Sequence, residues 1–330
     1  MTNHCYINSL ALVSCQKPLS DEWWDTPVQY DRDYARAIEP DTKEFIHPAE
    51  ARRMSKILKR SICTAITALN KAAISMPEAI ITGTGAGCME NSERFLCDLS
   101  KFGESCLKPT LFMQSTHNTI SSLVAIILKC HGYNNTYSHK EISFESALLD
   151  GWLQIKGGQI ANALLGAHDE VTPLMSLIME RTQPQYKFIS ETSMSSVISC
   201  EKGEDCHAEV EDVRILHKAT PGEVNDLIAG DNGLLLLGAN GNPLNDAPYD
   251  ALLNHRGNKD GVLGYKHVFG DNFSASAAGF YVAASILRRA GIPEFLKLDS
   301  RAAFPTDISG VTIVNHSGNA TWTVVKLKSI

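Results

Sequence analysis

The stretch Gly132–Asp169, GYNNTYSHKEISFESALLDGWLQIKGGQIANALLGAHD, decides the fold. After a turn-rich entry, apolar residues recur every three or four positions, as on one face of a helix: Phe144, Leu148, Trp152 and Ile155. The pair Gly157-Gly158 then separates this segment from an apolar run, Ile160–Leu165. A strand, a sharp turn, a helix and a second strand predict an α/β fold. The turn residue would lie at a helix N-terminus, where unpaired N–H groups favour an anion or a thiolate.

This stretch resembles the nucleophile elbow of the β-ketoacyl synthases, GPN-x-x-x-x-T-A-C-x-x-G, followed by a helix and a strand. Gly132, Asn134 and the Gly157-Gly158 pair fall in register without a gap, and Glu141 then stands at the position of the family's cysteine. A carboxylate at a helix N-terminus is a stabilised anion but a poor acyl carrier, because its acyl product would be an activated mixed anhydride. The resemblance therefore implies an elbow without its nucleophile.

Two further segments resemble those that carry the family's catalytic histidines. Gly238–Asp246, GANGNPLND, resembles A-H-G-T-x-T-P-x-x-D, with Asn240 nearest to the first histidine. Tyr265–Asp271, YKHVFGD, resembles T-K-x-x-x-G-H; Lys266 is retained and Asp271 replaces the second histidine.

Three catalytic positions are therefore replaced, by Glu141, Asn240 and Asp271. Decarboxylative condensation needs a thiolate to hold the chain and donors to stabilise the enolate. Two carboxylates in a pocket built for malonyl would also repel its carboxylate. We predict that the subunit does not condense by itself, and that Lys266 pairs with Glu141 or Asp271 as a structural plug.

The resemblance points to the chain length factors, ketosynthase-like subunits that pair with an active ketosynthase and set product length. It implies bacterial type II polyketide or fatty-acid-type synthesis, with aryl polyene pathways as the nearest match. The implied partners are an active ketosynthase in a heterodimer, or a second copy in a homodimer, and an acyl carrier protein. The implied fold is the thiolase fold: two similar α/β halves, about 1–180 and 181–330, in a five-layer α-β-α-β-α body.

Three alternatives stay open at this point. Glu141 or Asp271 could act as an acid or base in an autonomous enzyme, such as a malonyl-carrier decarboxylase or a divergent 3-oxoacyl carrier-protein synthase. A displaced cysteine such as Cys130 could serve as nucleophile, although it precedes the entry turn at Gly132. The chain could also be a homodimeric scaffold without a synthase partner.

Residues 108–128 resemble a family segment that lies at the dimer interface and lines the acyl tunnel, with Asn118 on the family's asparagine. By position, the candidates for limiting tunnel depth are Leu111, Phe112, Met113 and Thr116; plain packing is the alternative. Residues 315–319 resemble a shortened form of the family's terminal gate loop.

The segment Pro48–Ala73 is predicted to be one helix with an apolar stripe. Its opposite face is basic: Arg52, Arg53, Lys56, Lys59 and Arg60. Such a face is either solvated or a docking site for an acidic carrier protein.

A glycine-rich loop, Gly83–Gly87, follows a predicted strand at Ala79–Thr82. A nucleotide site is not predicted, because no acidic ribose ligand follows at the required spacing. The family has an equivalent turn that binds no nucleotide, so we expect no cofactor.

The chain has 330 residues, 44% of them apolar, and a net charge of −7. This balance, without any Lys/Arg run, argues against nucleic acid as a partner. No apolar run approaches the roughly 20 residues that cross a bilayer. Nine cysteines show no metal-ligand spacing, and Cys206-His207 lacks partners, so no metal site is predicted. We expect a cytoplasmic protein.

Overall fold

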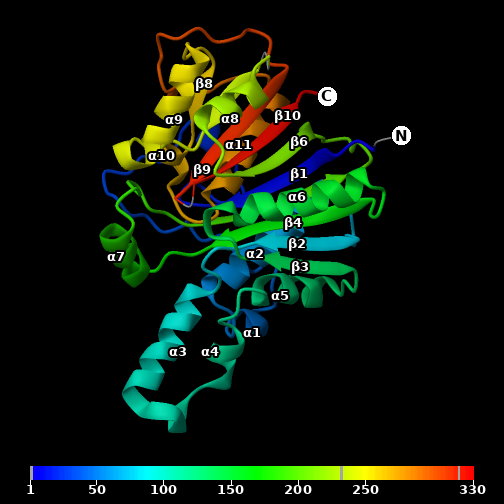
Figure 1. Cartoon of the computed structure of the whole chain (residues 1–330). Coiled ribbons are helices and arrows are strands. Elements are labelled where there is room, and N and C mark those ends of the chain that lie inside the picture. Colours follow the sequence, from blue (N-terminus) through cyan, green and yellow to red (C-terminus); the bar gives the residue numbers. More distant parts are fainter. Residues whose placement is uncertain (1–2, 231–232, 319) are drawn as a thin grey trace.

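The computed structural model describes residues 3–230, 233–318 and 320–330. Its described strands form one ten-stranded sheet in the order β3-β2-β4-β5-β1-β6-β10-β9-β7-β8 (Figure 1). The strand bounds are β1 Tyr6–Val13, β2 Ala79–Gly83, β3 Tyr133–Tyr137, β4 Asn162–Asp169, β5 Thr192–Ser199, β6 Ala208–His217, β7 Leu234–Leu237, β8 Val262–Gly264, β9 Gly310–Ser317 and β10 Thr321–Lys328.

The sheet contains an internal repeat that the residues themselves do not display. From one edge the order is β3-β2-β4-β5-β1, and from the other it is β8-β7-β9-β10-β6, the same order with each number raised by five. Parallel and antiparallel pairings correspond as well. A short antiparallel pairing of β1 with β6, at Tyr6 and Ile7, joins the two groups. The predicted boundary between residues 180 and 181 precedes β5, and it stays a prediction.

Helices complete five layers, which confirms the predicted thiolase-fold body. Helices α6 (Ser143–Lys156) and α11 (Ala275–Arg289) lie in the middle, because each contacts strands of both groups. Helices α2 (Lys56–Lys71) and α5 (Thr119–Leu128) cover the outer face of the first group. Helices α8 (Pro221–Ile228) and α9 (Pro243–Arg256) cover that of the second.

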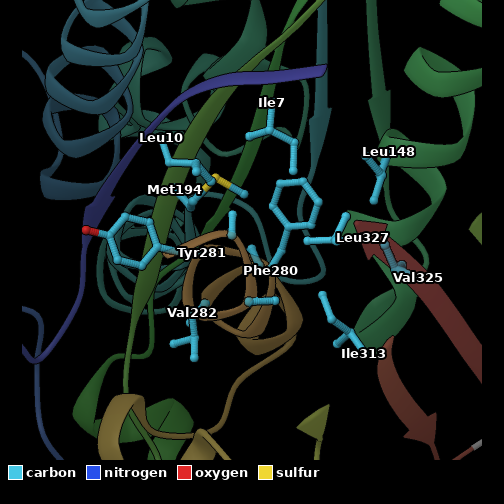
Figure 2. Close-up of a cluster of buried hydrophobic side chains, with 14 of the residues drawn as sticks. Ile7, Leu10, Leu148, Met194, Phe280, Tyr281, Val282, Ile313, Val325 and Leu327 are labelled. Atoms are coloured by element: carbon cyan, nitrogen blue, oxygen red, sulfur yellow. The ribbon is translucent and has the colours of Figure 1, made fainter. Parts of the chain in front are cut away.

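Burial on both faces explains why β7 reads Leu-Leu-Leu-Leu without alternation. Leu234 and Leu236 pack toward α11, whereas Leu235 and Leu237 pack against α8 and α9. Figure 2 shows the central cluster around Phe280 of α11, which gathers side chains from β1, β5, α6, β9 and β10. Helix α11 fits between the two groups of strands because many of its own residues are alanine or glycine. At Gly279, for example, a Cβ atom would lie only 2.8 Å from the ring of Tyr265.

The predicted helix Pro48–Ala73 is wrong in detail. It is divided into α1 (Pro48–Ala51) and α2, and extended backbone at Ser55 separates them. Arg60 is not on a basic face but buried, where it binds Glu39 and Glu191. Burial of a guanidinium requires such carboxylate partners.

An arm extends from the body between β2 and β3, at the lower left of Figure 1. It comprises α3 (Met89–Phe102), a short 3-10 turn (Gly103–Cys106) and α4 (Pro109–Met113). Phe95 and Phe112 pack ring to ring within it, while Leu96, Phe102 and Met113 are exposed. The remaining helices are α7 (Pro173–Thr182) and α10 (Lys266–Phe269), with 3-10 turns at Glu22–Trp24, Lys140–Ile142 and Glu294–Leu296. Within the described residues, no helix combines the length and apolarity that crossing a membrane requires.

Candidate functional site

Asp271 directly contacts two other sequence-predicted site residues, Asn240 and Lys266. Asn240 follows β7, whereas Lys266 begins the short helix α10 after β8 and Asp271 lies two residues beyond its end. Lys266 Nζ lies 3.0 Å from Asp271 Oδ1 and 3.1 Å from Oδ2. Asn240 Nδ2 donates to the same Oδ2 at 2.9 Å. The predicted ion pair of Lys266 is therefore confirmed, with Asp271 as its partner.

Both members of this pair are buried: Asp271 is 1% exposed and Lys266 is 9% exposed. A buried carboxylate is tolerated only when paired and hydrogen-bonded, and here an ammonium and an amide supply both. The Lys266 ammonium therefore already has a carboxylate partner within the fold.

Glu141 lies at the N-terminal end of α6, in the 3-10 turn Lys140–Ile142. The preceding Lys140 has a φ of 53°, the left-handed conformation that is uncommon outside glycine. The elbow predicted from the sequence is thus a sharp turn before a helix. Tyr186 donates its hydroxyl to Glu141 Oε1 at 3.2 Å. Burial raises the pKa of Tyr186 well above its ordinary value, with Asp271 and Glu141 adding to the shift, so the phenol stays a donor.

Glu141 and Lys266 line one cavity, whose volume is only about 30 Å³. A water molecule needs roughly 10–15 Å³ by the same measure, so the cavity admits a few waters and no acyl chain. Among the described residues, no cysteine lines it. Cys130 lies elsewhere, before β3, and its thiol donates to the carbonyl of Pro77.

His316 also lines this cavity, and the sequence reasoning did not select it. It lies on β9 with its ring edge against Trp322, at 4.6 Å between centroids. Burial and the nearby Lys266 ammonium lower the pKa of His316, so a neutral imidazole is favoured. The sequence feature that could have identified His316 is its position in residues 315–319, which resemble the family's gate loop. Asn319 of that segment lies outside the described residues.

Glu145 was missed as well, one helical turn after Glu141. It is fully buried and accepts from Ser276, Asn315 and Thr323. Burial raises the pKa of this carboxyl, while the three donors favour its charged form. The network ties α6 to α11 and to β9 and β10, and so fixes the elbow against the second half of the fold.

The glycine-rich loop after β2 binds the side chain of Asp169 through its own backbone and side-chain donors. The backbone N–H groups of Gly85 and Ala86 donate to Asp169 at 2.7–3.0 Å, and Thr84 Oγ1 donates at 3.0 Å. Ser274 of the second half donates to the same side chain. Among the described residues, no group of three His, Cys, Asp or Glu side chains is arranged to hold a metal.

The tunnel candidates lie apart from the cavity at Lys266. Leu111, Phe112 and Met113 belong to α4 of the arm, and Thr116 and Asn118 are exposed between α4 and α5. None of the five lines that cavity. Phe112 and Met113 are 59% and 69% exposed, although the ring of Phe112 packs against that of Phe95. Their assignment to a tunnel or interface stays a prediction.

The layered fold and the elbow at its centre define a thiolase-fold protein of the ketosynthase type. A family model described as "Beta-ketoacyl synthase, N-terminal domain" matches residues 23–225, more than half of the chain. The chain therefore belongs to the β-ketoacyl synthase family.

Solved structures with this fold cover nearly the whole chain. The ishigamide ketosynthase/chain length factor has a TM-score of 0.79 at 14% identity, covering 100% of both chains. The ketosynthase ApeO in complex with its chain length factor ApeC from Xenorhabdus doucetiae has 0.75 at 15%, covering 99% of this chain and 98% of that one. The complex AntDE:AntF, a type II polyketide synthase carrier protein with its ketosynthase, has 0.77 at 12%, covering 99% and 100%. No curated protein matches the sequence.

Proposed function

We propose that this chain is a chain length factor-type subunit that does not condense by itself and pairs with an active ketosynthase. The observation that carries the proposal is the small volume of the cavity at the elbow. Glu141 occupies the nucleophile position there, and Asp271 neutralises the one cation, Lys266, that the described lining residues contribute.

The chemistry of condensation supports this assignment. Claisen-type carbon–carbon bond formation needs an acyl thioester on the enzyme and donors for the developing enolate. Glu141 offers a carboxylate in place of a thiolate, and Asp271 offers an acceptor in place of a donor. An incoming malonyl carboxylate would also approach Glu141, a like charge.

One flank of the fold offers a surface for the partner. Strand β3 forms an edge of the sheet, and α5 beside it exposes Ile126 by 71%. Exposed edge strands and apolar side chains invite a partner. The arm, which carries Phe112 and Met113, is inserted between β2 and β3 in the sequence. We assign the arm to contact the ketosynthase and to limit the depth of its acyl tunnel.

A groove beside the arm suits an acidic acyl carrier protein. Its volume is about 560 Å³, and its rim carries Arg52, Arg53, Arg94 and Lys108. Four cations at one groove stand out on a chain of net charge −7. Complementary charge would steer an acidic partner to this groove. Of the predicted basic face, Arg52 and Arg53 lie at this groove, whereas Arg60 is buried.

The titles of two neighbours concern chain length factors and that of another a type II polyketide carrier protein. They support a place in bacterial polyketide or fatty-acid-type synthesis, and we assign the chain to an aryl polyene-type pathway in the cytoplasm.

Co-expression with the ketosynthase encoded nearest to it, followed by size-exclusion chromatography and a condensation assay, tests the function. We expect a one-to-one heterodimer whose condensing activity and product length depend on both subunits. A stable homodimer with no effect on the ketosynthase would instead support the scaffold. Release of carbon dioxide from malonyl carrier protein by this chain alone would support the decarboxylase.

A further inference from the structure

A second cavity lies in the C-terminal part of the fold, between α9, β7, β8 and the segment at Leu298, near the top of Figure 1. Its volume is about 280 Å³, against about 30 Å³ for the cavity at Lys266. An apolar cavity of roughly 150 Å³ holds benzene. This cavity therefore has room for a larger organic ligand.

Part of the cavity lining is apolar. It includes Leu237, Ala239 and Val262, which are buried, and Leu253 of α9. Leu298, 46% exposed, lies across one side. Such a surface favours the hydrocarbon part of a ligand, at about 0.8 kcal/mol per buried methylene.

Two of the three aspartates that line the cavity already accept hydrogen bonds within the protein. Asp246 accepts from the backbone N–H groups of Asn240 and Gly241, and Asp299 accepts from Arg301. Lys259 acts on Asp299, whose pKa it helps to lower. Asp250 has no hydrogen-bond or ion-pair partner among the described residues. It is thus the carboxylate that remains available for a cation.

We propose that this cavity binds a small ligand with an apolar body and a protonated amine. The hydrocarbon part lies on Leu237, Val262 and Leu253, and the ammonium pairs with Asp250. A ligand with the same body and a hydroxyl gains no ion pair, and one with a carboxylate meets three aspartates against one lysine. The site is separate from the proposed pairing with a ketosynthase and does not depend on it.

Isothermal titration of the purified full chain with n-hexylamine, hexan-1-ol and hexanoate tests this site. We expect saturable one-to-one binding in the order hexylamine, hexanol, hexanoate. Affinity should rise about threefold to fourfold per methylene from butylamine to hexylamine. Methyl NMR signals of Leu237 and Val262 should shift on titration. Equal affinity for hexanoate, or unshifted signals, overturns the proposal.

Substitutions locate the amine. Asp250 is exposed, so Asp250→Asn should lower the affinity for hexylamine about twofold to fivefold, as for a surface ion pair, and leave that for hexanol unchanged. Asp226→Asn, a matched change of an exposed aspartate on the neighbouring α8, should alter neither. Leu298→Trp should weaken all three ligands by filling the cavity. Unchanged hexylamine binding by Asp250→Asn overturns the assignment of the ammonium.

Discussion

Lys266 Nζ and Asp271 Oδ1 lie 3.0 Å apart, in a place that solvent scarcely reaches. Asn240 Nδ2 completes the coordination of the carboxylate at 2.9 Å. The three residues come from two strand ends of the second half of the fold, and together they occupy the space beside the elbow.

Removing the carboxylate alone should destabilise the protein strongly. Asp271→Asn leaves the Lys266 ammonium buried without a counterion, which costs about 3–5 kcal/mol of unfolding free energy. The double change Asp271→Asn with Lys266→Met should cost far less, because neither charge remains. Chemical denaturation of the four proteins of the cycle measures the coupling, and additive single effects would contradict an ion pair that matters.

Restoring a thiol at the elbow should not restore condensation. Glu141→Cys creates a nucleophile at a helix N-terminus, but the cavity of about 30 Å³ has no room for an acyl chain. We expect alkylation by iodoacetamide and no acyl adduct by intact mass after incubation with acyl carrier protein. An acyl thioester on the introduced thiol would show that the cavity opens.

The arm should matter for assembly and not for folding. Phe112→Asp changes a side chain that is 59% exposed and packs against Phe95, so the stability of the isolated chain should fall by no more than about 0.5–1.5 kcal/mol. Its affinity for the ketosynthase should fall at least about tenfold, because a charge is buried at the interface. The control is Leu244→Asp, at a similarly exposed site on α9. Size-exclusion chromatography measures how much heterodimer each variant forms.

Charge reversal in the groove should weaken the carrier protein. Arg53→Glu combined with Arg94→Glu should reduce the carrier-dependent activity of the heterodimer about tenfold at low salt. The reduction should be smaller at high salt, because salt screens the attraction between the groove and the carrier protein. Lys202→Glu, an exposed lysine outside the groove, should have little effect. Equal losses in all variants would point to net charge and not to this groove.

The buried Glu170 should make stability depend on pH. Burial raises its pKa from 4.5 to about 7, although the backbone N–H of Glu90 donates to Oε1. The folded state therefore holds this proton more tightly than the unfolded chain. Burying the charged carboxylate therefore lowers the free energy of unfolding more as the pH rises above 4.5. The loss of stability is under about 1 kcal/mol at pH 5 and about 3 kcal/mol at pH 8.

Glu170→Gln removes this titration and keeps an acceptor for the Glu90 N–H. It should raise the melting temperature clearly at pH 8 and only slightly at pH 5. The exposed Glu204→Gln serves as the control at both values. An equal gain at both pH values would mean that the carboxylate is not the source of the effect.

The sequence by itself determined the local features of this protein. Apolar periodicity and glycine breaks located α6 and β4, and the spacing of Gly132 and Gly157-Gly158 put Glu141 at the elbow. The ion pair of Lys266 and Asp271 was within reach of the same reasoning, because the two residues are five positions apart. The prediction of one helix at Pro48–Ala73 failed, because periodicity continues through the break at Ser55.

Only the tertiary structure decided what surrounds Glu141. Tyr186, Asn315 and His316 line the same cavity as Glu141, although they lie 45 to 175 positions from it in the sequence. Their meeting depends on how the two halves pack around α6 and α11, a long-range property that no local pattern encodes. The small volume of the cavity depends on it too, since volume is set by the close packing of side chains from both halves.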